Sequence, residues 1–415
     1  MSDIPSEITN DILIHLPDKF MLSNLPSEIL ENILSRLPVK TLKRFRAVEK
    51  SWCYLIDSGR FAKMHLHRSF ISSSLLNLIS GFLGFYWMGL DSLDQAQAIK
   101  PEFVYDHKFC HPISNSCNGL VVVMREPEPP VLWNPFSREY KFLPKCPLDF
   151  SADSSFSCKT TYGFGYDSRN DDYKVVKVMS FEKLSSWMLS EEWIYSLKSN
   201  CWRRTKGTYY DRGHWPTHVN GALHALIRTG LDHSTSKIKI MGFSVESEKD
   251  YEVMMPEIDR KDLIHVSLEL FDGCLALVCS YTFGVVIWVM EEYGVKVSWT
   301  ALLSFPREPH GFVCPLVYSK ERDKILLNCS GQTLIFYGLR TTSVENFTMP
   351  FGFSPGLCVE TLISPNEWDK RSTGEKSSAE EHHKNGKEMM MMMMMKKKKK
   401  KERDAFLSAG FKLLL

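Results

Sequence analysis

Apolar residues in the amino-terminal part of the chain recur at helical spacing. Pro26 suits the first position of a helix, where its missing N–H costs nothing, and Pro38 ends a helix at the residue before it. The apolar positions between these prolines, and those that follow them, repeat every three or four residues: Ile29, Leu30, Ile33, Leu34, Leu37, Leu42, Phe45, Val48, Trp52, Leu55 and Ile56. The pattern predicts a unit of three short helices.

This helical unit has more apolar surface than it can cover by itself. Three helices in about 40 residues cannot enclose a self-sufficient core. Full burial of one such side chain contributes about 1.5–3 kcal/mol. We therefore expect some of these side chains to be covered by the following domain or by another protein.

Between about residues 100 and 365, short β-rich runs alternate with turns, and few helical patterns occur. Runs such as LVVVM (120–124), ALVCS (276–280) and VVIWVM (285–290) have the composition of strands. Regular short strands separated by turn signals predict an all-β sandwich, barrel or propeller.

The spacing of the hairpins favours the propeller. Five segments have the form strand, polar turn, strand, and an aromatic residue follows each turn: Tyr140, Trp202, Tyr251, Trp299 and Phe347. Their spacings are 62, 49, 48 and 48 residues, and repeats of about 40–50 residues with several strands each are the signature of a propeller. Turn dipeptides before apolar runs recur at Asn118-Gly119, Asn220-Gly221 and Asp272-Gly273. Residues 70–112, joined with the carboxyl end near 357–363, would supply a sixth blade.

The two ends of the chain fall outside these patterns. Residues 4–20 match residues 25–41 at nine of 17 positions, and residues 366–415 contain runs of seven Met and six Lys that offer no pattern for packing. We predict an α+β multidomain chain with four parts: a partial duplicate of the first helix (1–22), a three-helix unit (23–66), an all-β propeller of about six blades (70–365) and a disordered low-complexity tail (366–415).

Residues 69–90 contain no charged residue over 22 positions, a length that could span a bilayer. The stretch also holds five Ser, one Asn and three Gly, and Ser80-Gly81 resembles a turn between two short apolar runs. A buried β-hairpin or packed linker is the favoured interpretation, and a membrane segment is the alternative.

Composition and charge exclude several classes of protein. The chain has 51 Lys and Arg and 49 Asp and Glu, a formal charge of +2. It therefore lacks the excess of basic residues that is typical of a nucleic-acid-binding protein. Eleven cysteines without a Cys-x-x-Cys pair are typical of reduced thiols in the cytoplasm or nucleus. The first 20 residues have no basic region before an apolar core, so a secretory signal is not expected.

The sequence contains no recognisable enzymatic motif. It has no Gly-rich phosphate loop with Lys-Ser/Thr, no Gly-x-Ser-x-Gly elbow and no His-Glu-x-x-His. We expect no catalytic residue, no metal and no cofactor. Histidines and cysteines that lie near one another lack the spacing of a standard zinc site, and a structural role is expected for them: His65, His67, His107, Cys110, His111, Cys117, His214 and His218.

Residues 25–56 (LPSEILENILSRLPVKTLKRFRAVEKSWCYLI) resemble an F-box. Downstream segments resemble, in type and in order, the type 1 F-box-associated domain of plant F-box proteins, a group with S-locus F-box-like and kelch-like members. These segments include SCNGLVVV (116–123), LWNPFSREYKFLP (132–144), YGFGYDSRNDDYKVVKV (162–178), VNGALHAL (219–226) and VETLISP (359–365). The resemblance covers about residues 4–365.

The resemblance implies a non-catalytic substrate receptor of an SCF-type ubiquitin ligase in the cytoplasm or nucleus. The F-box of such proteins binds a Skp-type adaptor, which joins it to a cullin scaffold and a RING subunit, and the associated domain captures a protein target. By resemblance, ten residues match the apolar F-box pattern and are candidates for adaptor binding: Leu25, Pro26, Ile29, Ile33, Leu34, Leu37, Pro38, Leu42, Val48 and Trp52. Some would face the adaptor and others would hold the helices together, and the sequence does not separate these roles.

Two other interpretations stay open. Ala47 and Glu49 depart from the family pattern, and the duplicated helix could compete for the adaptor. The chain could therefore be a propeller interaction module that is not assembled into a ligase. The other alternative is an enzyme on a propeller scaffold, which would need converging acid–base or metal groups.

Overall fold

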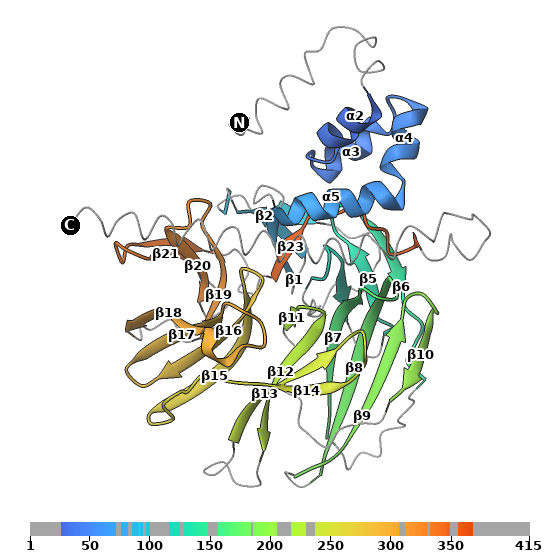
Figure 1. The fold of residues 1–415 in the computed structure, drawn as a ribbon. Coiled ribbons are helices and arrows are strands. Elements are labelled where there is room, and N and C mark those ends of the chain that lie inside the picture. Colours follow the sequence, from blue (N-terminus) through green and yellow to red (C-terminus); the bar gives the residue numbers. More distant parts are fainter. Residues whose placement is uncertain are drawn as a thin grey trace.

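The described residues form four α-helices and six β-sheets, and the sheets are arranged as the blades of a propeller (Figure 1). The structure is a computed structural model that describes residues 26–71, 76–81, 85–90, 92–93, 97–99, 116–124, 128–147, 157–183, 186–205, 217–229, 237–306, 312–329, 333–348 and 356–367. The predicted partial duplicate (1–22) lies outside the described residues, as do residues 368–415 of the predicted tail.

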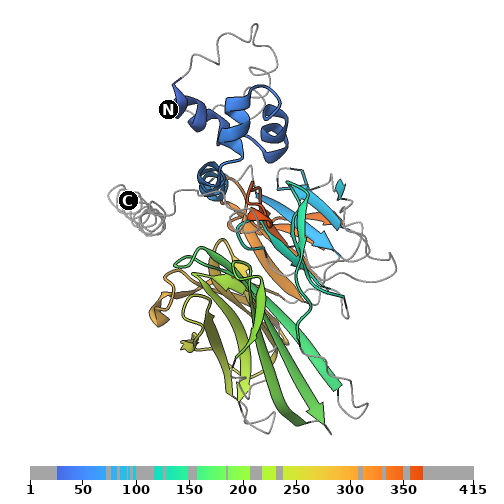
Figure 2. The same ribbon diagram turned by 90° about the vertical axis from the view of Figure 1, so that its right-hand side faces the viewer.

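The helices are α2 (Ser27–Leu34), α3 (Val39–Phe45), α4 (Lys50–Ile56) and α5 (Gly59–Ile71). Pro26 and Pro38 directly precede α2 and α3, where a residue without an N–H is tolerated. The three predicted helices are therefore present. The fourth helix, α5, crosses the predicted domain boundary at residue 66 and leads the chain to the propeller (Figure 2).

All strand pairs within the described sheets are antiparallel. The first blade, in the order β23-β1-β2-β3, consists of Gly356–Val359, Leu76–Gly81, Phe85–Gly89 and Gln97–Ile99. The second, β4-β5-β6, consists of Val121–Val123, Val131–Asn134 and Glu139–Phe142. The third, β7 to β10, consists of Ser157–Asp167, Asp172–Lys183, Ser186–Ser196 and Cys201–Arg204.

The remaining blades have four strands each. The fourth, β11 to β14, consists of Thr217–Val219, Ala222–Thr229, Lys237–Ser244 and Asp250–Val253. The fifth, β15 to β18, consists of Leu263–Phe271, Cys274–Tyr281, Gly284–Met290 and Trp299–Pro306, with the 3-10 helix η2 (Lys296–Ser298) before its last strand. The sixth, β19 to β22, consists of Val313–Tyr318, Lys324–Cys329, Thr333–Gly338 and Val344–Thr348. First strands of neighbouring blades contact one another, namely β7 with β11, β11 with β15 and β15 with β19, so these strands form the inner wall of the ring.

The repeating sequence signals occupy equivalent places in the blades. Each of the five aligned aromatic residues lies in the outermost strand of its sheet: β6, β10, β14, β18 and β22. Two of them also join blades, because the indole of Trp202 donates to the Pro144 carbonyl at 2.6 Å and that of Trp299 donates to the Met254 carbonyl at 2.9 Å. Asn118 and Gly119 both have positive φ, of 53° and 78°, as a tight hairpin turn requires.

The carboxyl end closes the ring, as the sequence predicts. β23 pairs with β1 from Leu76↔Val359 to Ile79↔Gly356, so the last strand supplies the inner edge of the first blade. Residues 76–89 form the β1–β2 hairpin, which confirms the favoured interpretation of the uncharged stretch. The predicted turn at Ser80-Gly81 is wrong, because both residues pair with β2 and the connection follows them. Among the described residues, no helix is long and apolar enough to cross a membrane.

Candidate functional site

The core of the helical unit contains six buried apolar side chains: Leu34, Leu37, Leu42, Trp52, Ile56 and Phe61. The ring of Phe45 packs edge-on against Trp52, with 5.6 Å between the centroids. Four of the ten candidate adaptor residues, Leu34, Leu37, Leu42 and Trp52, lie in this core and are at most 3% exposed. In this conformation they hold the helices together and offer no surface to a partner.

A second set of candidates points away from this core. Ile29 is 50% exposed and Val48 is 52% exposed, Pro26 is exposed and Ile33 is half-buried. Pro26, Ile29 and Ile33 lie three or four positions apart and therefore share one side of α2. We call Pro26, Ile29, Ile33 and Val48 the docking residues. Of the other two candidates, Pro38 is half-buried and Leu25 lies outside the described residues.

Sequence reasoning missed three large exposed side chains of the described helices, namely Tyr54 and, at the end of α5, Phe70 and Ile71. Tyr54 in α4 is 78% exposed. It lies two positions from the buried Trp52, and on a helix this spacing places it on the opposite side. The signal was available, because Tyr54 falls outside the three-to-four-residue rhythm of the core positions.

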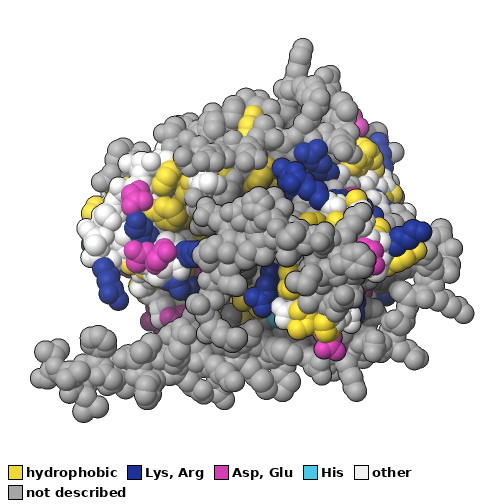
Figure 3. All heavy atoms as spheres, turned by 90° about the horizontal axis from the view of Figure 1, so that it is seen from above, with side chains coloured by type: hydrophobic (Ala, Val, Ile, Leu, Met, Phe, Trp, Pro, Cys, Tyr) yellow, Lys and Arg dark blue, Asp and Glu magenta, His cyan; other side chains and the backbone are white. Residues whose placement is uncertain are grey.

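The helices carry a strong excess of positive charge. Residues 26–71 contain nine Lys or Arg and four Asp or Glu, which gives the unit a formal charge of +5. Burial and the nearby positive charge of Arg36 lower the pKa of Arg68, so two arginines lie close together here. A view onto this end of the molecule shows apolar and basic side chains next to one another (Figure 3). A partner with acidic groups around an apolar centre would match this surface.

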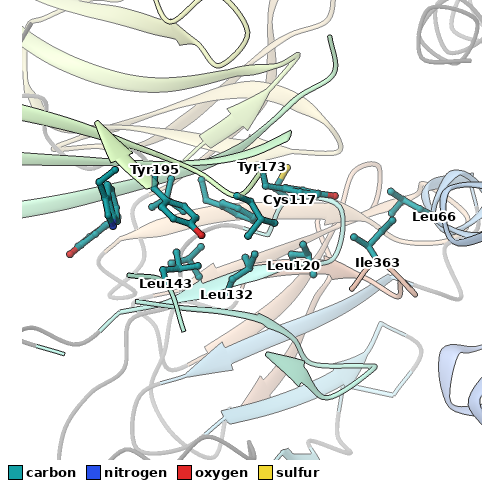
Figure 4. Packing of buried hydrophobic residues seen from close by; sticks show 14 of the residues in the cluster. Leu66, Cys117, Leu120, Leu132, Leu143, Tyr173, Tyr195 and Ile363 are labelled. Carbon is teal, nitrogen blue, oxygen red and sulfur yellow. The ribbon is translucent and has the colours of Figure 1, made fainter. Parts of the chain in front are cut away.

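Helix α5 belongs to both domains. On one side Phe61 lies in the helical core, and Nε2 of the buried His65 lies 2.9 Å from the Leu37 carbonyl. On the other side Ala62 and Leu66 pack into a cluster of the propeller that includes Leu120, Leu132 and Ile363 (Figure 4). One helix with both sides buried fixes the orientation of the helical unit on the propeller.

Polar contacts strengthen this joint between the helical unit and the propeller. Lys43 donates to the Ser137 carbonyl at 2.7 Å and lies 3.1 Å from the Glu139 carboxylate. Lys63 in α5 lies 2.9 Å from Asp171 in the turn between β7 and β8. Each exposed or half-exposed ion pair contributes at most about 1 kcal/mol, so their main effect is to fix the position of the helices.

The segment after the closing strand completes the joint. The Val39 N–H at the start of α3 donates to the Glu360 carboxylate at 2.8 Å, although burial raises the pKa of Glu360 above its usual value. The buried Asn134 side chain donates to the carbonyls of Thr361 and Ile363, both at 2.9 Å. The ring closure and the helical unit therefore depend on the same residues, 356–363.

The most nucleophile-like arrangement among the described residues is a cysteine beside a histidine. The Cys117 Sγ lies 3.8 Å from Nδ1 of His218 in β11. Burial raises the pKa of Cys117 and lowers that of His218 to about 4, so both groups are neutral at pH 7. An activated thiolate requires the opposite shift of the cysteine pKa, and this pair has the properties of a packing contact.

None of the other histidine and cysteine candidates that the structure describes lies in a group of side chains that could hold a metal ion. His65 is buried against the Leu37 carbonyl, and His107, Cys110, His111 and His214 lie outside the described residues. Among the described residues, no three His, Cys, Asp or Glu side chains are placed to hold a metal ion. Nine cysteines in the described part of the chain are free thiols: Cys53, Cys117, Cys146, Cys201, Cys274, Cys279, Cys314, Cys329 and Cys358.

Comparisons with known proteins identify both domains. A family model described as the F-box domain matches residues 22–63, and the F-box associated beta propeller domain matches residues 79–342. The F-box protein CPR1 of Arabidopsis thaliana is 30% identical, with 100% of both chains covered. The F-box/kelch-repeat protein At3g23880 of the same plant is 29% identical over 88% of this chain and 96% of its own.

The similarity to solved structures is weak. An oligogalacturonate lyase from Vibrio parahaemolyticus has a TM-score of 0.38 at 9% identity, over 64% of this chain and 71% of its own. So low a score carries no functional argument.

Proposed function

Because the chain belongs to the F-box proteins that carry an F-box-associated β-propeller, we propose that it is the substrate-recognition subunit of an SCF-type ubiquitin ligase. In this proposal the helical unit binds a Skp-type adaptor, and through it a cullin and a RING subunit. The propeller holds a protein target for ubiquitination. A cytoplasmic or nuclear location is part of the same proposal.

The exposed docking residues carry this proposal. The helical unit buries its leucines and Trp52, yet Ile29 and Val48 remain half exposed on a surface with a formal charge of +5. Because full burial contributes about 1.5–3 kcal/mol and these side chains are half exposed, covering the remainder would contribute about half of that amount for each side chain. A partner that covers them recovers this free energy, and the resulting contact is a helix packed into an apolar groove.

The joint at α5 explains how binding at the helices would affect a distant target. Ala62, Leu66 and the Lys63–Asp171 pair fix the helices on the propeller. A target on the propeller would thus be held at a set distance from the adaptor-bound machinery. Ubiquitin transfer by a conjugating enzyme then gains from high effective concentration, and the receptor itself supplies no reacting group.

The target would contact the propeller at the end opposite α5. The turns between the first and second strands of the blades lie at the end of the propeller where α5 docks, because Asp171, in such a turn, pairs with Lys63 of α5. Tyr281 is the last residue of β16, the second strand of the fifth blade, and therefore lies at the opposite end. There the exposed Phe283 stacks on Tyr281 with 5.2 Å between centroids, and the exposed Phe312 lies edge-on to His265 at 4.7 Å. Phe283→Ser with Phe312→Ser should alter the ubiquitinated proteins in quantitative proteomics and leave adaptor affinity unchanged.

The direct test is the affinity of the full chain for a purified Skp-type adaptor. Ile29→Asp should weaken binding about tenfold or more, because it removes an apolar contact and places a carboxylate, which is costly to take out of water, in the apolar groove. Ile264→Asp is a matched control, since Ile264 is 49% exposed on the propeller, and it should leave the dissociation constant unchanged. Equal affinities of the two variants, with both chains folded by circular dichroism, would contradict the proposal.

A further inference from the structure

Three large exposed apolar side chains gather where the fifth and sixth blades meet. Phe283 is 67% exposed, Phe312 is 64% exposed and Ile264 is 49% exposed. Phe283 lies in the turn between β16 and β17, Ile264 lies near the start of β15, and Phe312 directly precedes β19, which contacts β15. We call Ile264, Phe283 and Phe312 the apolar strip. It lies at the end of the propeller opposite α5 and is therefore separate from the docking residues.

The turn that carries Phe283 breaks the usual rule for a hairpin. Thr282 and Phe283 alone separate β16 from β17, and such tips favour Gly, Asn and Asp. The turn is held in place, because the Thr282 N–H donates to the Asp262 carbonyl at 3.1 Å and a Cβ on Gly284 would lie 2.7 Å from the Phe305 carbonyl oxygen. A local rule that is broken at an exposed and fixed tip indicates a binding role.

A β-bulge places Ile264 on the surface. Leu263 pairs with Tyr281 and His265 pairs with Ser280, so Ile264 has no partner in β16. Bulges change the direction of a side chain and are frequent next to functional sites. The exposure of Ile264 therefore follows from a specific irregularity of β15.

Two ring contacts support the aromatic side chains of the apolar strip. Phe283 stacks on Tyr281 with 5.2 Å between centroids and 14° between the ring planes, and Phe312 lies edge-on to His265 at 4.7 Å. Side chains that are already held in place lose little conformational entropy when a ligand binds. The strip thus presents preorganised apolar contacts on both sides of Ile264.

The charges beside the apolar strip are balanced. Glu257 pairs with Lys296 at 3.2 Å. The rest of the segment that leads into β15 has two acidic and two basic residues, which cancel: Asp259, Arg260, Lys261 and Asp262. An acidic or phosphorylated ligand would thus find no excess of positive charge in this segment, in contrast to the helical unit with its formal charge of +5. An uncharged apolar ligand matches the strip.

The size of the apolar strip limits what can bind it. A buried aromatic side chain covers about 150–250 Å², so three large side chains that are half to two-thirds exposed offer about 300–400 Å². A stable contact between two copies of the chain needs about 800 Å² from each copy. The strip is therefore too small to hold a dimer together, and its size fits a short segment that binds reversibly.

We infer that the apolar strip binds a short, extended, uncharged apolar segment of the target protein, an inference that rests on the proposed function for the fate of that target. Successive side chains of an extended segment point to opposite sides, so every second side chain of the bound segment contacts Phe283, Ile264 or Phe312. The targets are then proteins that expose such a segment, and recognition requires no phosphate group.

The test is selection of a random peptide library, displayed on phage, on the full chain. The wild-type chain should enrich uncharged peptides with apolar side chains at alternate positions. A synthetic peptide of the enriched sequence should bind Phe283→Ser with Phe312→Ser at least about tenfold more weakly in fluorescence anisotropy, because two apolar contacts are removed. The matched control is Val297→Ser with Val344→Ser, since both valines are exposed elsewhere on the propeller, and it should bind the peptide like wild type.

Several results would overturn the inference. These are no enrichment on the wild-type chain, enrichment of acidic peptides, and equal peptide binding by the wild type and the Phe variant. A dimer in analytical ultracentrifugation that the Phe variant abolishes would also overturn it, because the strip would then bind a second copy. Adaptor affinity, measured on the same proteins, separates the two proposals: the Phe variant should bind the adaptor like wild type, and a wild-type chain that binds no adaptor would contradict the proposed function alone.

Discussion

The helical unit and the propeller bury their apolar residues to different extents. Between the third and fourth blades, Val176, Leu223 and Phe243 are at most 2% exposed, because each sheet of a closed ring is covered by its neighbours. The helical unit leaves Ile29, Val48 and Tyr54 between 50% and 78% exposed. A closed ring covers its own apolar surface. The apolar surface of three short helices is covered only in part, by α5 and the propeller, and in our proposal an adaptor covers the rest.

The largest expected effect comes from opening the ring. A chain that ends at residue 355 lacks β23, the buried Val359 and Ile363, and the Asn134 and Glu360 contacts. Loss of three or more buried side chains, each contributing about 1.5–3 kcal/mol, approaches the whole stability of a domain, about 5–15 kcal/mol. Calorimetry should show no cooperative transition. The control, a chain that ends at residue 367, should melt like wild type, and a cooperative transition in the shorter chain would show that closure is unnecessary.

The next effect separates the two sides of α2. Leu34→Ala should destabilise the helices by about 2–5 kcal/mol, because Leu34 is 1% exposed and its removal leaves a cavity. Ile29→Ala should change stability by less than about 0.5 kcal/mol, because Ile29 is half exposed in the free chain. Hydrogen exchange of the α2–α4 amides measures both values, and equal protection in the two variants would contradict the assignment of sides.

A smaller effect concerns the stability of the folded chain at low pH. His218 has a pKa of about 4 in the folded chain and about 6.5 when unfolded. The unfolded state therefore binds more protons between these values, and stability falls as the pH is lowered from about 6.5 towards 4. At pH 5 the loss is about 2 kcal/mol. His218→Gln should remove it, measured as the difference in unfolding free energy between pH 7 and pH 5, and an unchanged difference would show that His218 does not contribute.

Local rules were sufficient to predict the architecture. The Asn118-Gly119 turn was predictable because few residue pairs accept positive φ at both positions. The regular spacing of Trp202 and its counterparts predicted the repeat of the blades, whereas their place in the outermost strands became visible only in the structure. The closing role of residues 356–359 followed because the first blade was incomplete without them.

Contacts between distant segments were not predictable. Lys63 and Asp171 are 108 residues apart, and Cys117 and His218 are 101 residues apart, so no local pattern reports them. The same limit applied to the candidate site. Ile33 and Leu34 are adjacent and both apolar, and only the placement of α3, α4 and α5 decides that Leu34 is buried while Ile33 remains partly exposed.

The central claim is that the exposed side of α2 contacts a Skp-type adaptor. Its most direct test is site-specific photo-crosslinking, with a photoreactive phenylalanine analogue at position 29 or, as control, at position 264 of the full chain mixed with purified adaptor. The account predicts a covalent adaptor adduct from position 29 and none from position 264. No adduct from position 29, or equal adducts from both positions, would contradict it.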